Sequence, residues 1–124
     1  MQDENVMEEE LKERTKRFAL RIMKLVDSLP RSTSANVIGR QVIRSGTSVG
    51  ANYRAACRGR SKAEFISKLG VVVEEVDETC FWLELIIEGS LLPKEKVLSL
   101  LNEADELTAI FVSSIKTSRG NQKS

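Results

Sequence analysis

Residues 39–65 read GRQVIRSGTSVGANYRAACRGRSKAEF, and the rest of the 124-residue chain is organised around this stretch. It contains four of the seven glycines and no acidic residue before Glu64. Small residues recur on one side of the predicted helix at steps of three and four, whereas arginines recur on the other side. This pattern predicts a helix with one face against the protein core and one basic face.

The glycines within this predicted helix have two interpretations. A glycine in a helix interior costs about 1 kcal/mol relative to alanine, so the presence of Gly39, Gly46 and Gly50 needs a physical reason. Either a neighbouring helix packs closely against them, or the helix bends or breaks near Ser45 and Gly46.

Apolar residues at helical spacing also occur before and after this stretch. They predict four helices near residues 7–29, 33–58, 62–88 and 94–118, in one domain of residues 1–124. Pro30 ends the first helix, Ser61 and Glu64 form a capping box for the third, and Pro93 opens the fourth. Short connections make successive helices antiparallel, so we expect an all-α, antiparallel up-down-up-down four-helix bundle.

The charge is distributed unevenly although the formal net charge is only +1. Residues 28–63 contain seven basic residues and no acid, whereas residues 64–88 contain seven acids and one base. Arg40, Arg44, Arg54 and Arg58 share one face of the second predicted helix over a rise of about 27 Å. Arg60 and Lys62 extend this basic surface into the following loop and the start of the third helix.

The four arginines on this face form an arginine stripe, which has three possible interpretations. Arginine binds phosphate in a bidentate manner, so the stripe is a candidate RNA- or DNA-binding surface. The acids of the third helix are an alternative partner, either within one subunit or across an interface. A merely solvated face is the third interpretation.

Two further sets of residues are candidates for contacts between elements. Ser45 and Asn52 are predicted to be polar residues of the core, which would fix the register of the helices or, for Asn52, bind a ligand. Phe81, Trp82 and Leu85 are candidates for an apolar interface, with packing in the core as the alternative.

Several classes of function lack support in the sequence. The absence of histidine excludes imidazole catalysis and most zinc sites. We find neither a phosphate-binding loop nor a dinucleotide-binding motif, and predict no enzyme, no catalytic residue, no metal and no cofactor. Cys57 and Cys80 are expected to be reduced. With no apolar run of membrane length and an acidic N-terminus, we expect a cytoplasmic protein without a membrane partner.

Residues 43–52 read IRSGTSVGAN and resemble the R-x-x-x-S-[IV]-x-x-N core of the 23S rRNA-intervening-sequence proteins. Residues 59–65, GRSKAEF, are similar to the G-x-[GR]-S-x-x-E-F that follows in this family. Many members have N-x-x-E-G between the two, but residues 52–59 contain no acid here. The resemblance implies an all-α bundle and a homo-oligomer in the form of a pentameric ring.

Together, these observations predict a non-enzymatic homo-oligomeric bundle that binds RNA or DNA through the basic stripe. The alternative is a structural or adaptor oligomer that binds a protein partner and uses the arginines in salt bridges between subunits.

Overall fold

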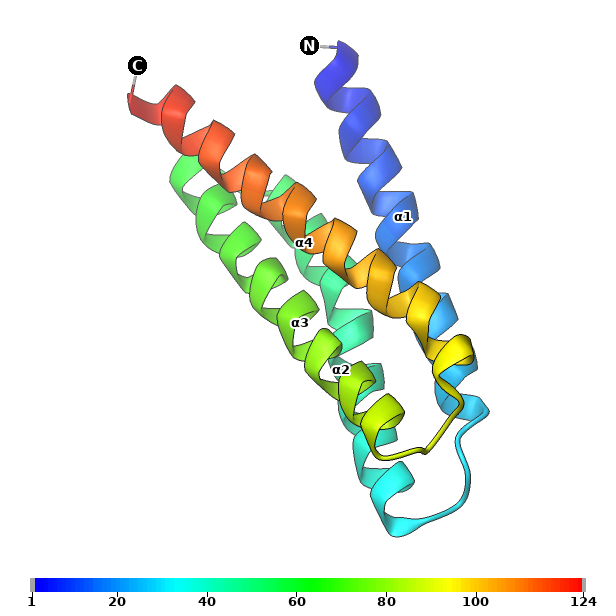
Figure 1. Cartoon of the computed structure of the whole chain (residues 1–124). Coiled ribbons are helices and arrows are strands. Elements are labelled where there is room, and N and C mark those ends of the chain that lie inside the picture. The colour runs from blue at the N-terminus through cyan, green and yellow to red at the C-terminus, as the bar shows by residue number, and fades with distance from the viewer. Residues whose placement is uncertain (1, 124) are drawn as a thin grey trace.

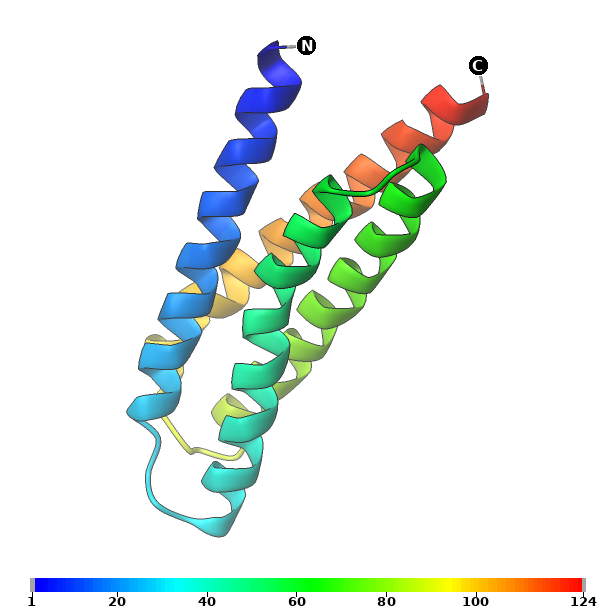
Figure 2. The same ribbon diagram turned by 180° about the vertical axis from the view of Figure 1, so that it is seen from behind.

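The computed structural model describes residues 2–123, and the side chains of residues 6–120. The helices are α1 (Gln2–Asp27), α2 (Thr33–Cys57), α3 (Lys62–Glu88) and α4 (Lys94–Lys123). They run up and down in turn as an all-α bundle, and no strand occurs in residues 2–123 (Figures 1 and 2). No helix of this part of the chain is long and apolar enough to cross a membrane.

The helix ends follow the local signals of the sequence. Ser61 accepts a hydrogen bond from the backbone N–H of Glu64, as in the predicted capping box, and Ser32 caps α2 through the N–H of Ala35. The outer helix ends differ from the prediction, since α1 starts near residue 2 and α4 extends to residue 123. Neither extension contains a proline, the residue that would oppose a helix interior there.

One hydrophobic core receives residues from all four helices. Phe18, Val49, Leu83 and Phe111 each come from a different helix and are at most 1% exposed. Tyr53 of α2 packs on Phe111, with ring centroids 5.2 Å apart. Burying such a side chain stabilises the fold by about 1.5–3 kcal/mol, whereas the helix propensities of most residues differ by at most about 0.7 kcal/mol each.

The glycines of α2 allow α1 to approach closely. A Cβ atom on Gly46 would lie 2.9 Å from Ile22 Cγ1, and one on Gly50 would lie 3.1 Å from Thr15 Oγ1. These distances confirm the interpretation as a close helix contact. The helix does not break near Ser45 and Gly46, because α2 is continuous from Thr33 to Cys57.

The contact between α1 and α4 is looser than the other neighbouring contacts. The C-terminal end of α1 lies near the N-terminal end of α4, and the two helices separate toward the chain termini (Figures 1 and 2). Arg14 of α1 joins them through a bidentate pair with Glu103, with distances of 2.7 Å (Nε–Oε2) and 2.8 Å (Nη2–Oε1). Through hydrogen bonding and charge, Arg14 lowers the pKa of the Glu103 carboxyl below its ordinary value.

The first prediction concerns the close contact at Gly46. Gly46→Ala gains about 1 kcal/mol of helix propensity, but it overpacks against the stiff, fully buried Ile22, which costs about 1–3 kcal/mol. We expect a net loss of stability in urea unfolding followed by circular dichroism. Gly70→Ala is the matched control in α3, because no atom lies within 4 Å of its added Cβ, and it should stabilise by about 0.5–1 kcal/mol. Equal stabilisation by both variants would contradict the close contact.

The second prediction concerns pH. A carboxyl whose pKa is lowered on folding contributes stability above its unfolded pKa of about 4.3 and loses it as pH falls through the folded value. Glu103→Gln should therefore cost about 1 kcal/mol at neutral pH, and its difference from the native protein should vanish in acid below the folded pKa. Glu106→Gln serves as the control, because the Glu106 side chain is 67% exposed and makes a single contact with Arg14 at 3.3 Å. A Glu103→Gln effect that does not change with pH would contradict the role of the charge.

Candidate functional site

The arginine stripe lies on the outer face of an unbroken α2. Arg40, Arg44, Arg54 and Arg58 are all exposed, on the side of the helix opposite the buried Val42, Val49 and Ala56. The stripe faces outward because α1 and α3 pack against the small and apolar side of α2.

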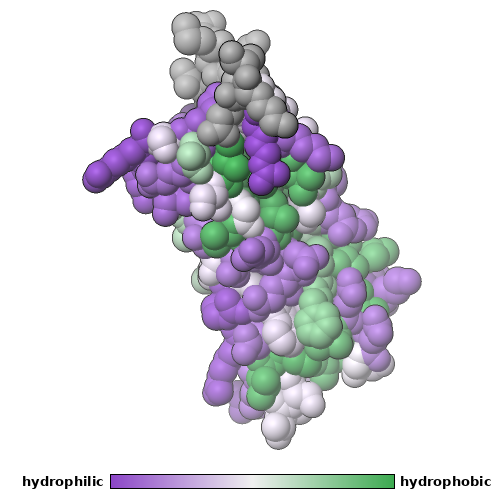
Figure 3. Space-filling view, turned by 90° about the vertical axis from the view of Figure 1, so that its left-hand side faces the viewer, coloured by the Kyte–Doolittle hydropathy of each residue, from purple (hydrophilic) through white to green (hydrophobic). Residues whose placement is uncertain are grey.

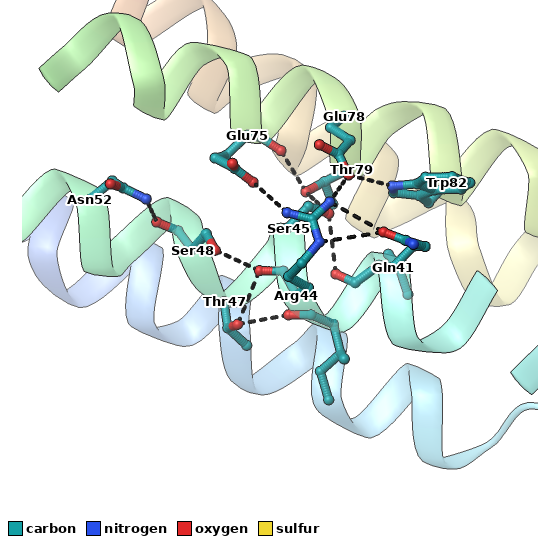
Figure 4. A network of polar contacts seen from close by, with 12 residues as sticks. Gln41, Arg44, Ser45, Thr47, Ser48, Asn52, Glu75, Glu78, Thr79 and Trp82 are labelled. Atoms are coloured by element: carbon teal, nitrogen blue, oxygen red, sulfur yellow. Dashed lines mark hydrogen bonds and ion pairs between the residues drawn. The ribbon is translucent and has the colours of Figure 1, made fainter. Parts of the chain in front are cut away.

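Arg44 differs from the other arginines because it binds carboxylates of α3. Its Nη2 group makes an ion pair and hydrogen bond with Glu78, and its Nη1 lies 3.6 Å from Glu75 Oε2 (Figure 4). Gln41 accepts from the same guanidinium, and Glu78 also accepts from the indole N–H of Trp82 at 2.9 Å. Glu75 Oε2 is buried without a hydrogen bond, so the nearby Arg44 charge is its main compensation. The predicted pairing of the stripe with α3 thus holds within the chain for Arg44.

The remaining cations of the stripe have no such partner among the described residues. Arg40, Arg54 and Arg58 are exposed, and no described carboxylate lies within ion-pair distance of them. Arg60 and Lys62 are also exposed, in the loop after α2 and at the first position of α3, and likewise have no described ion-pair partner. These five residues give the surface its positive charge.

Beneath the stripe, a buried hydroxyl pair joins α2 to α3. Ser45 and Thr79 have 0% exposure, and their hydroxyl oxygens are 2.8 Å apart. Thr79 Oγ1 also lies 2.7 Å from the carbonyl oxygen of Glu75, so Thr79 can donate to that carbonyl while Ser45 donates to Thr79. The expected polar core at Ser45 therefore has a partner, and the pair favours one register of α2 against α3.

Asn52 does not belong to this polar core, contrary to the prediction. It is only partly buried, and its side-chain amide donates to the carbonyl of Ser48 in its own helix at 2.9 Å. Each residue turns a helix by about 100°, and the next residue, Tyr53, takes the core position. Asn52 consequently lies at the edge of α2 that faces α3 (Figure 4).

The apolar interface candidates of α3 lie in different environments. Phe81 is 52% exposed, whereas Trp82 and Leu85 are partly buried, with Trp82 packed against the core. The rings of Phe81 and Trp82 meet edge to face with centroids 5.0 Å apart. Of the three, Phe81 is the apolar group most available to a partner.

Both cysteines are free, as expected from the sequence. Burial raises the pKa of both thiols, and that of Cys80 reaches about 12 with Asp105 as a further cause. These thiols are therefore protonated at neutral pH and are poor nucleophiles.

Sequence reasoning missed Thr79, the partner of Ser45. Cys80, the next residue of α3, is only partly buried. A sequence signal existed, because Thr79 follows Val76 by three residues and precedes Leu83 by four, the spacing of the observed core. The distance to Ser45, however, depends on how α2 and α3 pack.

The fold and the α2–α3 contacts define an all-α four-helix bundle without strands in its described part. The chain belongs to the 23S rRNA-intervening sequence protein family, whose sequence profile matches residues 7–113. It is also similar to a crystal structure from Bacteroides thetaiotaomicron VPI-5482, a protein of unknown function from the S23 ribosomal protein family. The two are 37% identical with a TM-score of 0.82, and the match covers 88% of this chain and 97% of the other. No curated protein matches the chain, and neither comparison indicates an enzymatic family.

The hydroxyl pair generates a third prediction. Thr79→Val preserves shape but leaves Ser45 Oγ with only a 3.4 Å contact to the carbonyl of Val42, so we expect a loss of about 1–3 kcal/mol in urea unfolding. Ser45→Ala should cost less, because Thr79 keeps the Glu75 carbonyl as its acceptor. In the double variant, the Ser45→Ala change should recover part of the Thr79→Val loss. Strictly additive losses would show that the two hydroxyl groups do not interact.

Proposed function

We propose that this protein is a non-enzymatic homo-oligomer that binds RNA or DNA through the outer face of α2. The observation that carries the proposal is the exposure of Arg40, Arg54 and Arg58 without an ion-pair partner among the described residues. Arg54 and Arg58 are one helix turn apart and repel each other. Phosphate groups along a nucleic-acid backbone pair with such cations and release counterions.

The geometry of the stripe suits a linear polyanion. A guanidinium presents two parallel N–H donors to a phosphate, and the stripe extends for about 27 Å along a rigid helix. Arg44 contributes less to this surface because Glu75 and Glu78 neutralise its charge.

The names of the related proteins support the proposal. The matched family is described by an intervening sequence of 23S rRNA, and the similar crystal structure by a ribosomal protein family. Both descriptions refer to ribosomal RNA or its particle, which is consistent with a basic surface that binds RNA.

The outer face of α3 supports the homo-oligomeric part of the proposal. Figure 3 views the side of the molecule on which α3 lies in Figure 1 and shows apolar side chains exposed among hydrophilic ones. Exposed acids on this helix accompany Phe81: Glu74, Asp77, Glu84 and Glu88. The α2 face of one copy complements such a surface in charge, and a ring of five copies is the arrangement that the resemblance implies.

This complementarity also favours a second candidate function, an adaptor oligomer in which the arginines form salt bridges with a neighbouring copy and a protein is the partner. In that case, the guanidinium groups would be covered in the assembly. The two functions therefore differ in what the same arginines contact.

The fourth prediction tests the function. In Arg40→Gln/Arg54→Gln/Arg58→Gln, affinity for a structured RNA or duplex DNA should fall at least tenfold at about 50 mM salt. The slope of log K against log salt should become shallower by about 3, because three phosphate contacts are lost. Fluorescence anisotropy over a salt series measures both quantities.

The control removes the same charge from exposed positions on α4. Lys94→Gln/Lys116→Gln/Arg119→Gln should bind nearly as well as the native protein. Light scattering on the same samples separates the two functions. If the stripe variant still binds nucleic acid but dissociates to a monomer of 13.9 kDa, the arginines belong to the subunit interface and the adaptor function holds instead.

A further inference from the structure

A groove between α1 and α2 places two lysines of α1 next to two arginines of the stripe. It has a volume of about 460 Å³. Lys12 and Lys16 of α1 line one wall, and Arg54 and Arg58 of α2 line the other. All four charged residues that line it are positive, although the chain as a whole is nearly neutral.

The floor of the groove is open because its residues are small. Ala19, Gly50 and Ala51 lie between the basic walls, with the hydroxyl-bearing Thr15 and Thr47 beside them. The contact of Gly50 with Thr15 brings the two helices close together, so the cations of both walls can reach one ligand.

From this arrangement we infer that the groove binds one sugar–phosphate strand of a nucleic-acid duplex, with Lys12 and Lys16 as phosphate ligands alongside Arg54 and Arg58. The inference rests on the proposed function and assigns its site and ligand class. The wall from Thr47 to Arg58 rises about 16 Å. One strand of a duplex advances about 3.4 Å along the duplex axis per phosphate, so a groove of this length spans at most about five phosphates.

The composition of the groove favours a duplex over a single strand. Proteins that bind single strands stack the bases on aromatic side chains in addition to contacting phosphates. None of the described residues that line this groove is aromatic. It therefore offers contacts to the backbone only, which a duplex presents in a regular array while its bases remain stacked on each other.

The lysines have acidic neighbours that do not prevent this role. Lys12 lies 3.4 Å from Glu8 and 3.3 Å from Glu9, and Lys16 lies 3.6 Å from Glu13. Lys16 is exposed, whereas the Lys12 side chain is 27% exposed. All three pairs lie within about one turn of α1, and pairs of this kind are weak and screened by salt. The hydrogen bond with Glu9 raises the pKa of Lys12, so this lysine carries its charge at any pH at which the protein would meet nucleic acid.

The fifth prediction uses two variants that perturb the groove differently. Lys12→Gln/Lys16→Gln removes charge from the α1 wall, and it should weaken binding to a duplex RNA of about 16 base pairs by at least threefold and make the salt slope shallower by about 2. Ala51→Leu fills the exposed floor without changing charge or helix propensity appreciably, and it should also weaken binding. Lys24→Gln/Lys94→Gln and Ala109→Leu, all at exposed positions outside the groove, are the matched controls and should bind like the native protein.

Anisotropy with the duplex and with a single strand of equal length gives outcomes that separate the two proposals. Tighter binding of the duplex, weakened by both groove variants and by neither control, supports the inference. Both groove variants could bind like the native protein while the Arg40, Arg54 and Arg58 variant does not. The groove is then not the binding site, and the proposed function stands. Tighter binding of the single strand overturns the ligand class. If the native protein binds neither probe, the proposed function fails and the inference fails with it.

Discussion

The close contact of α1 with the glycine side of α2 is the constraint on which the rest of the structure depends. Ile22 and Thr15 occupy the space that Cβ atoms of Gly46 and Gly50 would need. With these atoms in contact, α2 cannot rotate about its axis without a steric clash or loss of buried apolar surface. This orientation of α2 determines which of its side chains face solvent. The side chains that do so include the four arginines.

A second contact orients α2 from the side of α3. The Ser45–Thr79 pair is buried and polar, so a shift in register would leave hydroxyl groups without partners. Arg44, the residue before Ser45, forms ion pairs with Glu75 and Glu78 of α3. The same packing thus divides the arginines into one that links two helices and three that remain available to a ligand.

The open side of the bundle shows where packing is weakest. α1 and α4 separate toward the termini (Figure 1), and the bidentate pair of Arg14 with Glu103 is a main polar tie between them. Since α1 also supplies Lys12 and Lys16 to the basic groove, its position relative to α2 matters more for the proposed ligand than its position relative to α4.

The sequence by itself determined the helices and their order, because apolar periodicity, the two prolines and the capping box are local signals. It also determined that four arginines share one face of α2, since a helix has a fixed number of residues per turn. Only the tertiary structure decided that Thr79 contacts Ser45 and that Tyr53, not Asn52, lies in the core. It also decided that, among the described residues, Arg44 is the arginine of the four that pairs with acids. These outcomes depend on the rotation and spacing of helices that are distant in sequence. For the same reason, Lys12 and Lys16 join Arg54 and Arg58 only once α1 lies against Gly50.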